Sequence, residues 1–278
     1  MKNHQQPDEN TQSNGLQKVP FAPPNWLKEK INKKCACGAV FETWQSNRER
    51  CDKCIFKLRS IEEEKERAAN EVIMQSIENK RIRSAQFPVI WDGVSFETSK
   101  KQINTRALKQ AKEYAQSFHQ DNSSSVIYYS TEYGCGKTHL AVCIGKYVLH
   151  NLRQKVLFKP ARDLLMELKD SFNRRGYDVT PVSEKDIFEN ITYYNLIILD
   201  DVGRDTRSAW VENTYWSLFD KLMSHRIPVI ITTNMLPIDG GIKPKNGYLA
   251  NAIGQAAYSR LMGMAGNTFQ EIDGVDLR

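Results

Sequence analysis

Residues 131–138, Thr-Glu-Tyr-Gly-Cys-Gly-Lys-Thr, place glycines before a lysine and a hydroxyl, the order that phosphate binding requires. They match the phosphate-binding loop pattern G-x-x-x-x-G-K-[ST], except that Thr131 stands where the pattern has its first glycine. Glycines let backbone N–H groups turn toward phosphates, and the N-terminus of a following helix adds partial positive charge. Lys137 would then contact the β- and γ-phosphates of a nucleotide, and the Thr138 hydroxyl would ligate Mg²⁺.

The elements around this loop support the same interpretation. The apolar run at 126–129 predicts a buried strand before the loop, and the apolar residues within 140–149 predict a helix after it. Two glycines remain nearest the phosphates, so we expect binding to survive the departure at Thr131. The predicted nucleotide-binding residues are Gly134, Cys135, Gly136, Lys137, Thr138 and His139. For Cys135, a small buried loop residue is the default interpretation.

A second set of polar residues follows two further apolar runs. The run at 196–199 ends in Asp200 and Asp201, and the run at 228–233 ends in Asn234. Carboxylates at the C-terminal end of a buried parallel strand lie at the edge of the sheet where ligands bind. Asp200 would bind Mg²⁺ through water, and Asp201 would orient and deprotonate an attacking water. The Asn234 amide would contact the γ-phosphate or that water, or it would only cap the turn.

Four of the six cysteines form two close pairs, Cys35 with Cys37 and Cys51 with Cys54. Two such pairs on two turns can converge on one tetrahedral metal, and four thiolates favour zinc in a structural site. Disulfides are the competing interpretation, which a cytosolic compartment disfavours. Basic side chains surround the pairs, and this rim is either a solvated surface or a contact for nucleic acid or an acidic partner.

Length and composition limit the class of protein. The chain has 278 residues and a net charge of +6, which suits one α/β core with a small accessory domain and permits nucleic-acid binding without requiring it. No apolar run approaches the ~20 residues of a membrane span, and the polar start lacks a signal-peptide core. We therefore expect a cytoplasmic protein without membrane association.

Composition also divides the chain into four predicted regions. Residues 1–24 are polar and end in prolines, so a disordered tail is expected. A zinc-binding module covers 25–58. A charge-dense helical pattern with a thin apolar stripe covers 59–85, typical of a linker or a partner-binding helix. The nucleotide-binding domain covers 86–278.

From 86 to 278 the chain resembles the DnaC/IstB-like ATPases, the helicase-loader branch of the AAA+ superfamily. The resemblance includes the segment at 87–97 and the acidic strand end Leu-Asp-Asp-Val-Gly at 199–203. It continues through the polar strand Ile-Thr-Thr-Asn at 231–234, the helix at 253–261 with Ser-Arg-Leu, and the closing residues 273–278.

This resemblance implies an AAA+ P-loop α/β fold of three layers, with a five-stranded parallel sheet between helices and ATP with Mg²⁺ at its C-terminal edge. It implies a homo-oligomer on ATP binding, in which Arg260 reaches a neighbouring subunit's nucleotide; sensing within its own subunit is the competing role. Gly-Gln-Ala at 254–256 stands where the family usually has Gly-Glu-Arg, so one of two arginines is missing and weak hydrolysis is an open alternative.

The function implied is that of a P-loop ATPase that loads a hexameric replicative helicase onto single-stranded DNA during replication initiation. The zinc module and the following helix would grip the helicase. Two alternatives stay open. One is an IstB-like transposition helper ATPase, and the other is a nucleotide-gated DNA-binding adaptor with little hydrolysis.

Overall fold

The structure is a computed structural model that describes residues 29–99, 105–173, 183–237, 246–266 and 268–273. The chain divides into two compact units, Met1–Ile73 and Met74–Arg278, and the long helix α1 (Asp52–Ser84) contributes residues to both. The predicted disordered tail, 1–24, lies outside the described residues, as do the closing residues of the family resemblance from 274 onward.

The first unit contains a short antiparallel hairpin. Strands β1 (Ile31–Lys34) and β2 (Val40–Thr43) pair so that Lys34 faces Val40. The turn between them closes where the Gly38 amide donates to the Cys35 carbonyl at 2.9 Å. Gly38 has a φ of 90°, a left-handed conformation that favours glycine at this point of the turn.

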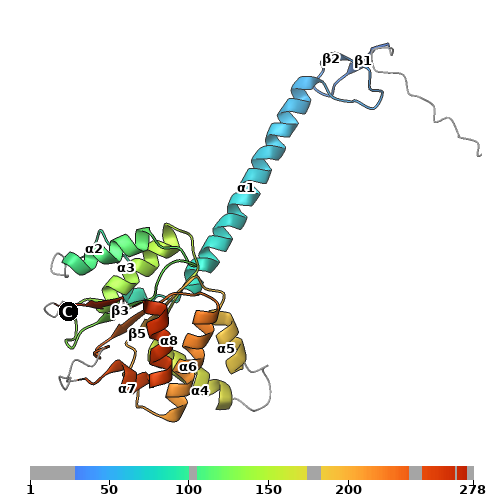
Figure 1. Cartoon of the computed structure of the whole chain (residues 1–278). Helices are drawn as coiled ribbons and strands as arrows, with labels where there is room; N and C mark the ends of the chain where they lie inside the picture. The colour runs from blue at the N-terminus through green and yellow to red at the C-terminus, as the bar shows by residue number, and fades with distance from the viewer. Residues whose placement is uncertain (1–28, 100–104, 174–182, 238–245, 267, 274–278) are drawn as a thin grey trace, which may run out of the picture. The chain divides into compact units, whose positions relative to one another are not determined.

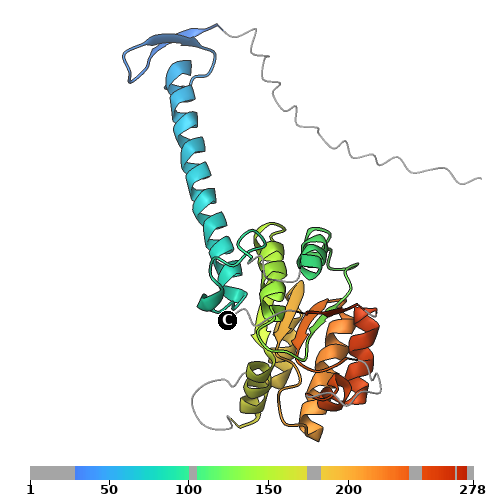
Figure 2. The same ribbon diagram turned by 90° about the vertical axis from the view of Figure 1, so that its left-hand side faces the viewer.

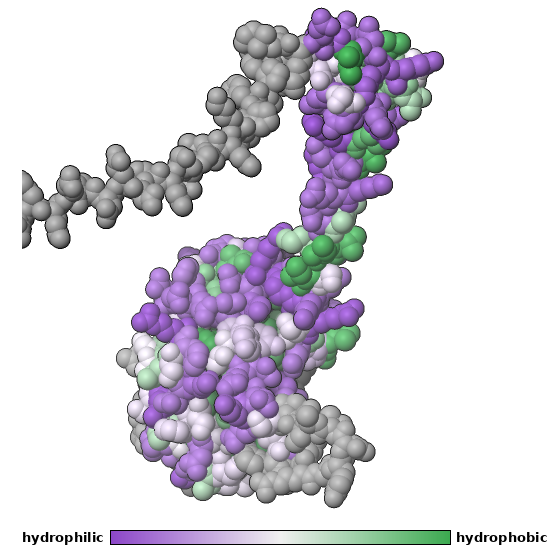
Figure 3. All heavy atoms as spheres, turned by 90° about the vertical axis from the view of Figure 1, so that its right-hand side faces the viewer, coloured by the Kyte–Doolittle hydropathy of each residue, from purple (hydrophilic) through white to green (hydrophobic). Residues whose placement is uncertain are grey.

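Helix α1 begins at Asp52, before the predicted linker start at 59, so that Cys54 lies in its first turn. None of its residues is buried. Its apolar side chains therefore remain on the surface, where Figure 3 shows green patches among purple; Val72, Ile73, Met74 and Ile77 are each more than half exposed. This agrees with the predicted thin apolar stripe, which is too narrow for a core helix.

The second unit is built on a five-stranded parallel sheet, as predicted (Figure 1). Its order is β4-β5-β6-β3-β7, and the pairs joining these strands are all parallel. The strands are β3 (Val126–Tyr129), β4 (Val156–Pro160), β5 (Leu196–Asp200), β6 (Val229–Thr233) and β7 (Phe269–Glu271). The carboxyl ends of all five therefore meet at one edge of the sheet.

Helices cover both faces of this sheet and make three layers (Figure 2). Alternate residues along a strand enter opposite layers: Ile197 and Leu199 pack on one side, Leu196 and Ile198 on the other. One face packs against α2 (Thr105–Gln116) and α3 (Lys137–His150). The other packs against α4 (Ala161–Asn173), α5 (Glu184–Ile191), α6 (Ala209–Ser224), α7 (Leu249–Ile253) and α8 (Gln255–Ala265).

The segment between α1 and α2 docks on the edge strand β4. The Phe158 amide donates to the Ala85 carbonyl at 2.8 Å, and the Phe87 and Phe158 rings lie 5.5 Å apart. The sequence predicts a partly extended lead-in here, and the structure places a single 3-10 turn in it, η2 (Val89–Trp91). The lead-in is thus anchored by its first residues rather than by a strand of its own.

Helix α3 approaches β5 closely at Gly145. A Cβ added there would lie 2.4 Å from Ile198 Cδ1 and 2.9 Å from Phe87 Cζ. Glycine is therefore needed at this position for space rather than for backbone freedom.

We expect Gly145→Ala to lower the free energy of unfolding by about 1–2 kcal/mol. Overpacking costs about 1–3 kcal/mol, while alanine gains about 0.5–1 kcal/mol in helix propensity. Gly263→Ala in α8 is the matched control, because an added Cβ there would meet only Met223 Sδ, at 4.0 Å. This substitution should raise the free energy of unfolding by about 0.5–1 kcal/mol. Chemical denaturation measures both, and a stabilised Gly145→Ala would contradict the close approach.

Candidate functional site

The loop after β3 has the backbone that phosphate binding needs. Gly134 and Gly136 have φ values of 73° and 100°, so both predicted turning glycines adopt left-handed conformations. Thr131 is not among the residues with positive φ. The departure from the loop pattern therefore costs no backbone strain, because this position does not use the conformation that only glycine adopts easily.

The side chain of Lys137 is folded into the loop. Its Nζ donates to the Glu132 carbonyl at 2.9 Å and lies 3.4 Å from Cys135 Sγ. Both Lys137 and Cys135 are buried. These partners are a carbonyl and a thiol rather than a carboxylate, so a phosphate could replace them at little electrostatic cost.

Asp200 connects the loop helix to the sheet. One of its oxygens, Oδ1, accepts hydrogen bonds from the hydroxyls of Thr138 at 2.7 Å and Thr232 at 2.6 Å. Burial raises the pKa of Asp200, and the two hydroxyl bonds oppose that rise. The predicted magnesium ligands, Thr138 and Asp200, are therefore in direct contact.

Asp201 follows the strand in a left-handed conformation, with φ of 61°. Its backbone amide donates to Thr232 Oγ1 at 2.9 Å. Its carboxylate accepts from Asn234 Nδ2 at 3.3 Å and from Arg204 at 2.7 Å. The Arg204 side chain is 74% exposed, so this ion pair contributes little and can open readily.

Asn234 has one polar atom left for a ligand. Its Nδ2 is used by Asp201, while its Oδ1 is buried and has no hydrogen-bond partner among the described residues. A buried unpaired oxygen is unfavourable unless a water or a ligand hydrogen-bonds to it. The structure thus brings Thr138, Asp200, Asp201 and Asn234 into one hydrogen-bonded set.

Two residues that contact this set escaped the sequence-based prediction. Thr232 bridges the two aspartates, and Arg204 pairs with Asp201. The available signal for Thr232 was a hydroxyl residue within an otherwise apolar buried strand. Arg204 carried no comparable signal, since an arginine in a loop is usually solvated.

Two predicted site residues point elsewhere. His139 Nε2 hydrogen-bonds with Ser99 Oγ at 2.9 Å, and its ring meets Trp91 edge-on, so its side chain faces the lead-in. Arg260 on α8 donates to Asp220 Oδ1 at 2.7 Å and stacks over Trp216 at 4.6 Å, both on α6. The contacts of Arg260 are thus with α6 and its own helix, rather than with the loop of the same chain.

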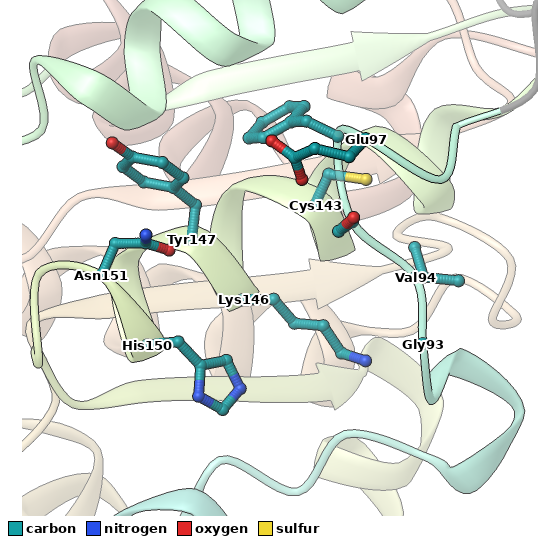
Figure 4. Close-up of a pocket in the computed structure, with 10 residues that line it drawn as sticks. Gly93, Val94, Glu97, Cys143, Lys146, Tyr147, His150 and Asn151 are labelled. Carbon is teal, nitrogen blue, oxygen red and sulfur yellow. The ribbon is translucent and has the colours of Figure 1, made fainter.

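A separate hollow lies between the lead-in and the C-terminal half of α3 (Figure 4). Glu97 approaches it from the lead-in, and Cys143, Lys146 and His150 approach it from the helix. Its lining residues on α3 lie in the C-terminal half of that helix, whereas the phosphate loop precedes the N-terminus of α3. We therefore place the nucleotide site at the loop and the aspartates, not in this hollow.

The four cysteines of the first unit form a compact cluster. The Sγ atoms of Cys35, Cys37, Cys51 and Cys54 all lie within 4.8 Å of one another, and those of Cys37 and Cys51 are 3.7 Å apart. Four sulfurs on a tetrahedral zinc with bonds of about 2.3 Å would be about 3.8 Å apart. Backbone amides of Cys37 and Cys51 lower the pKa of Cys35 to about 6, whereas hydrogen bonds with the other three cysteines raise the pKa of Cys54 to about 12. The cluster fits a structural metal.

Comparisons with known proteins address the family. A family model described as IstB-like ATP binding protein matches residues 60–241, more than half of the chain. The replicative helicase loader DnaC of Escherichia coli K12 is 29% identical over 129 residues, 46% of this chain and 49% of the loader. That of Buchnera aphidicola subsp. Schizaphis graminum is 27% identical over 131 residues, 47% and 50% of the two chains. The chain thus spans about half the length of these relatives.

Solved structures agree on the fold. A crystal structure of the DnaC helicase loader superposes with a TM-score of 0.56 at 20% identity, covering 67% of this chain and 100% of that one. The replication initiator DnaA bound to AMPPCP and single-stranded DNA superposes with a TM-score of 0.52 at 16% identity, covering 67% and 51%. Identities this low support the AAA+ fold alone. Among the described residues, no helix is long and apolar enough to cross a membrane.

We expect native mass spectrometry of the full chain to find one bound zinc ion, because four convergent thiols are the usual ligands of a structural zinc. Cys51→Ser and Cys54→Ser should lose the ion, since three thiolates no longer close the site. Cys143→Ser is the matched control, because that buried cysteine lies outside the cluster. A metal-free wild type whose mass is reduced by the hydrogens lost to disulfides would contradict the metal site.

Proposed function

The chain belongs to the DnaC/IstB-like AAA+ ATPases, within the family of IstB-like ATP-binding proteins, and we propose that it hydrolyses ATP to load a replicative helicase onto single-stranded DNA. The observation that carries the ATPase part is the hydrogen-bonded set at the sheet edge. There the Thr138 hydroxyl contacts the Asp200 carboxylate, and the Asn234 amide contacts the Asp201 carboxylate.

The residues at this edge suit ATP with Mg²⁺. Lys137 and the amides of the glycine turn would bind the phosphates, and Thr138 with Asp200 would hold the cation. A bound Mg²⁺ would neutralise charge that develops on the phosphates. Once the Asp201 carboxylate is free of its ion pair with Arg204, it would accept a proton from the attacking water. Asn234 would orient that water through its unpaired Oδ1.

The helicase-loading part rests on the relatives and on the two-unit chain. The loaders that it resembles are named for replicative helicases, and this chain places a four-cysteine module before its ATPase domain. We propose that this module and α1 contact a hexameric helicase, because α1 leaves its apolar side chains exposed. Single-stranded DNA as the destination of the helicase belongs to the same proposal.

Assembly on ATP and the role of Arg260 are also proposals. Arg260 is held by Asp220 and Trp216, both on α6, rather than by residues of its own phosphate loop. An arginine placed there would serve a neighbouring subunit more readily than its own. To do so it would exchange Asp220 for a phosphate, and both are bidentate anionic partners for a guanidinium.

One alternative function has a specific observation in its favour. The family model that matches this chain is described as IstB-like ATP binding protein, so an IstB-like transposition helper with the same ATPase core is the second candidate. The two candidates share the nucleotide site and differ in the partner that the first unit contacts.

Two substitutions test the ATPase chemistry. Lys137→Ala should weaken ATP binding by about 10- to 150-fold, because a charged hydrogen bond contributes about 1.5–3 kcal/mol. Asp201→Asn should retain binding and lose about 10²–10⁴-fold in turnover, because an amide cannot accept the water's proton. Asparagine also tolerates the left-handed backbone of Asp201, so the substitution isolates the chemistry.

Equilibrium binding of a fluorescent ATP analogue and phosphate release measure these effects. Lys109→Ala on the exposed face of α2 serves as the matched lysine control. Unchanged turnover in Asp201→Asn would remove this residue from the mechanism.

Capture of partners separates the functions. With ATP, the tagged full chain should retain a hexameric replicative helicase from extract of the organism that encodes it, identified by mass spectrometry. Cys51→Ser should lose the helicase and keep ATP binding, because the cluster lies in the first unit and the nucleotide site in the second. A transposase in place of the helicase would favour the transposition helper, and DNA binding with negligible turnover would favour the adaptor.

A further inference from the structure

Asn246 joins the two strands that carry the site. Its Nδ2 donates to the carbonyl of Thr131 at 3.1 Å and to the carbonyl of Asn234 at 3.2 Å. Thr131 begins the phosphate loop just past β3, and Asn234 lies just past the adjacent strand β6. The carboxamide therefore bridges these strands at the point where their own backbone pairing ends.

The bridge lies at the first position of the loop pattern, where this chain has threonine instead of glycine. The acceptor is the Thr131 carbonyl, so the bond depends on the backbone path rather than on the threonine side chain. On the other strand the acceptor belongs to Asn234, whose side chain contacts the Asp201 carboxylate. One side chain thus holds both the start of the loop and the residue that orients Asp201.

Asn246 is itself held by the main chain. The Leu236 amide donates to the Gly247 carbonyl at 3.2 Å, and the Leu249 amide donates to the Leu236 carbonyl at 2.9 Å. These bonds pair the residues around Asn246 with the continuation of β6, independently of any nucleotide. Gly247 has a φ of 84°, which fits glycine and lets the chain turn into α7 directly after the bridge.

We propose that Asn246 is a positioning residue for ATP hydrolysis, a role that rests on the proposed ATPase function. It fixes the distance between the phosphate loop and Asn234, and through Asn234 it sets the orientation of Asp201. Alignment of this kind affects the rate more than the affinity, because a misplacement of about 1 Å can cost about 10²-fold in rate. Lys137 and the amides of the glycine turn would still bind the phosphates, so the affinity for ATP would change little.

The test compares kcat and the ATP Kd of full-length variants. Asn246→Ala removes the donor, and Asn246→Asp is nearly isosteric but turns a carboxylate oxygen toward two carbonyls. We expect kcat to fall about 10-fold in the first and about 10²-fold in the second, with Kd changed by less than about threefold. Asn251→Ala, at an exposed position of α7, is the matched control and should leave both constants unchanged.

A double variant decides whether Asn246 acts through Asn234. If it does, Asn246→Ala combined with Asn234→Ala should hydrolyse ATP no more slowly than Asn234→Ala alone. The proposal would be overturned if the double variant lost as much turnover as the product of the two single losses. It would also be overturned if the ATP Kd of Asn246→Ala rose as much as its kcat fell, which would leave Asn246 with a structural role. Thermal unfolding of each variant identifies any that fail to fold.

Hydrogen exchange provides a readout that needs no turnover. In the absence of nucleotide, Asn246→Ala should speed amide exchange in the loop at 131–136, and Asn251→Ala should not. If the wild type hydrolyses no ATP, the proposed function fails, and this exchange still decides whether Asn246 holds the loop. Unchanged exchange in the loop of Asn246→Ala would overturn the proposal.

Discussion

The carboxylate of Asp200 is partly buried at the end of β5, where it accepts hydrogen bonds from Thr138 and Thr232. Removing a carboxylate from water is costly, and burial alone raises the pKa of this group. The two hydroxyls recover part of that cost, and each comes from a different element, α3 and β6. The rest of the site is therefore arranged around a partly buried carboxylate, a natural place for a divalent cation.

The parallel topology makes this arrangement possible. Strand β3 lies between β6 and β7, with β5 next to β6, so the elements that follow β3, β5 and β6 emerge side by side. The phosphate loop follows β3, the two aspartates lie at the end of β5, and Asn234 follows β6. Ligands in open α/β sheets bind at the carboxyl ends of the strands for this geometric reason.

The two units are stabilised by different means. The second unit packs apolar residues on both faces of its sheet, where Leu196 to Leu199 are all buried. In the part that the structure describes, from residue 29 onward, the first unit has a two-stranded hairpin, a helix without buried residues and the cluster of four cysteines. A unit this small gains little from apolar burial, and a metal at the cluster would supply what its core cannot.

Local patterns in the sequence determined much of this protein. Continuous apolar runs predicted β3, β5 and β6, glycine spacing predicted the turns at Gly134 and Gly136, and the two cysteine pairs predicted the cluster. Each of these features depends on residues close together in the chain, so composition and spacing reveal them. The domain boundaries and the chemical roles of the site residues stay predictions.

Only the tertiary structure decided how distant residues meet. Thr138 and Asp200 are 62 positions apart, and Asn246 and Thr131 are 115 apart. Thr232 was visible in the sequence as a polar residue in a strand, but the sequence did not show that it would hydrogen-bond with both aspartates. The directions of His139 and Arg260 likewise depend on Ser99 and Asp220, which no local pattern connects to them. Such hydrogen bonds join single side chains across elements, and therefore leave no periodic signal in the sequence.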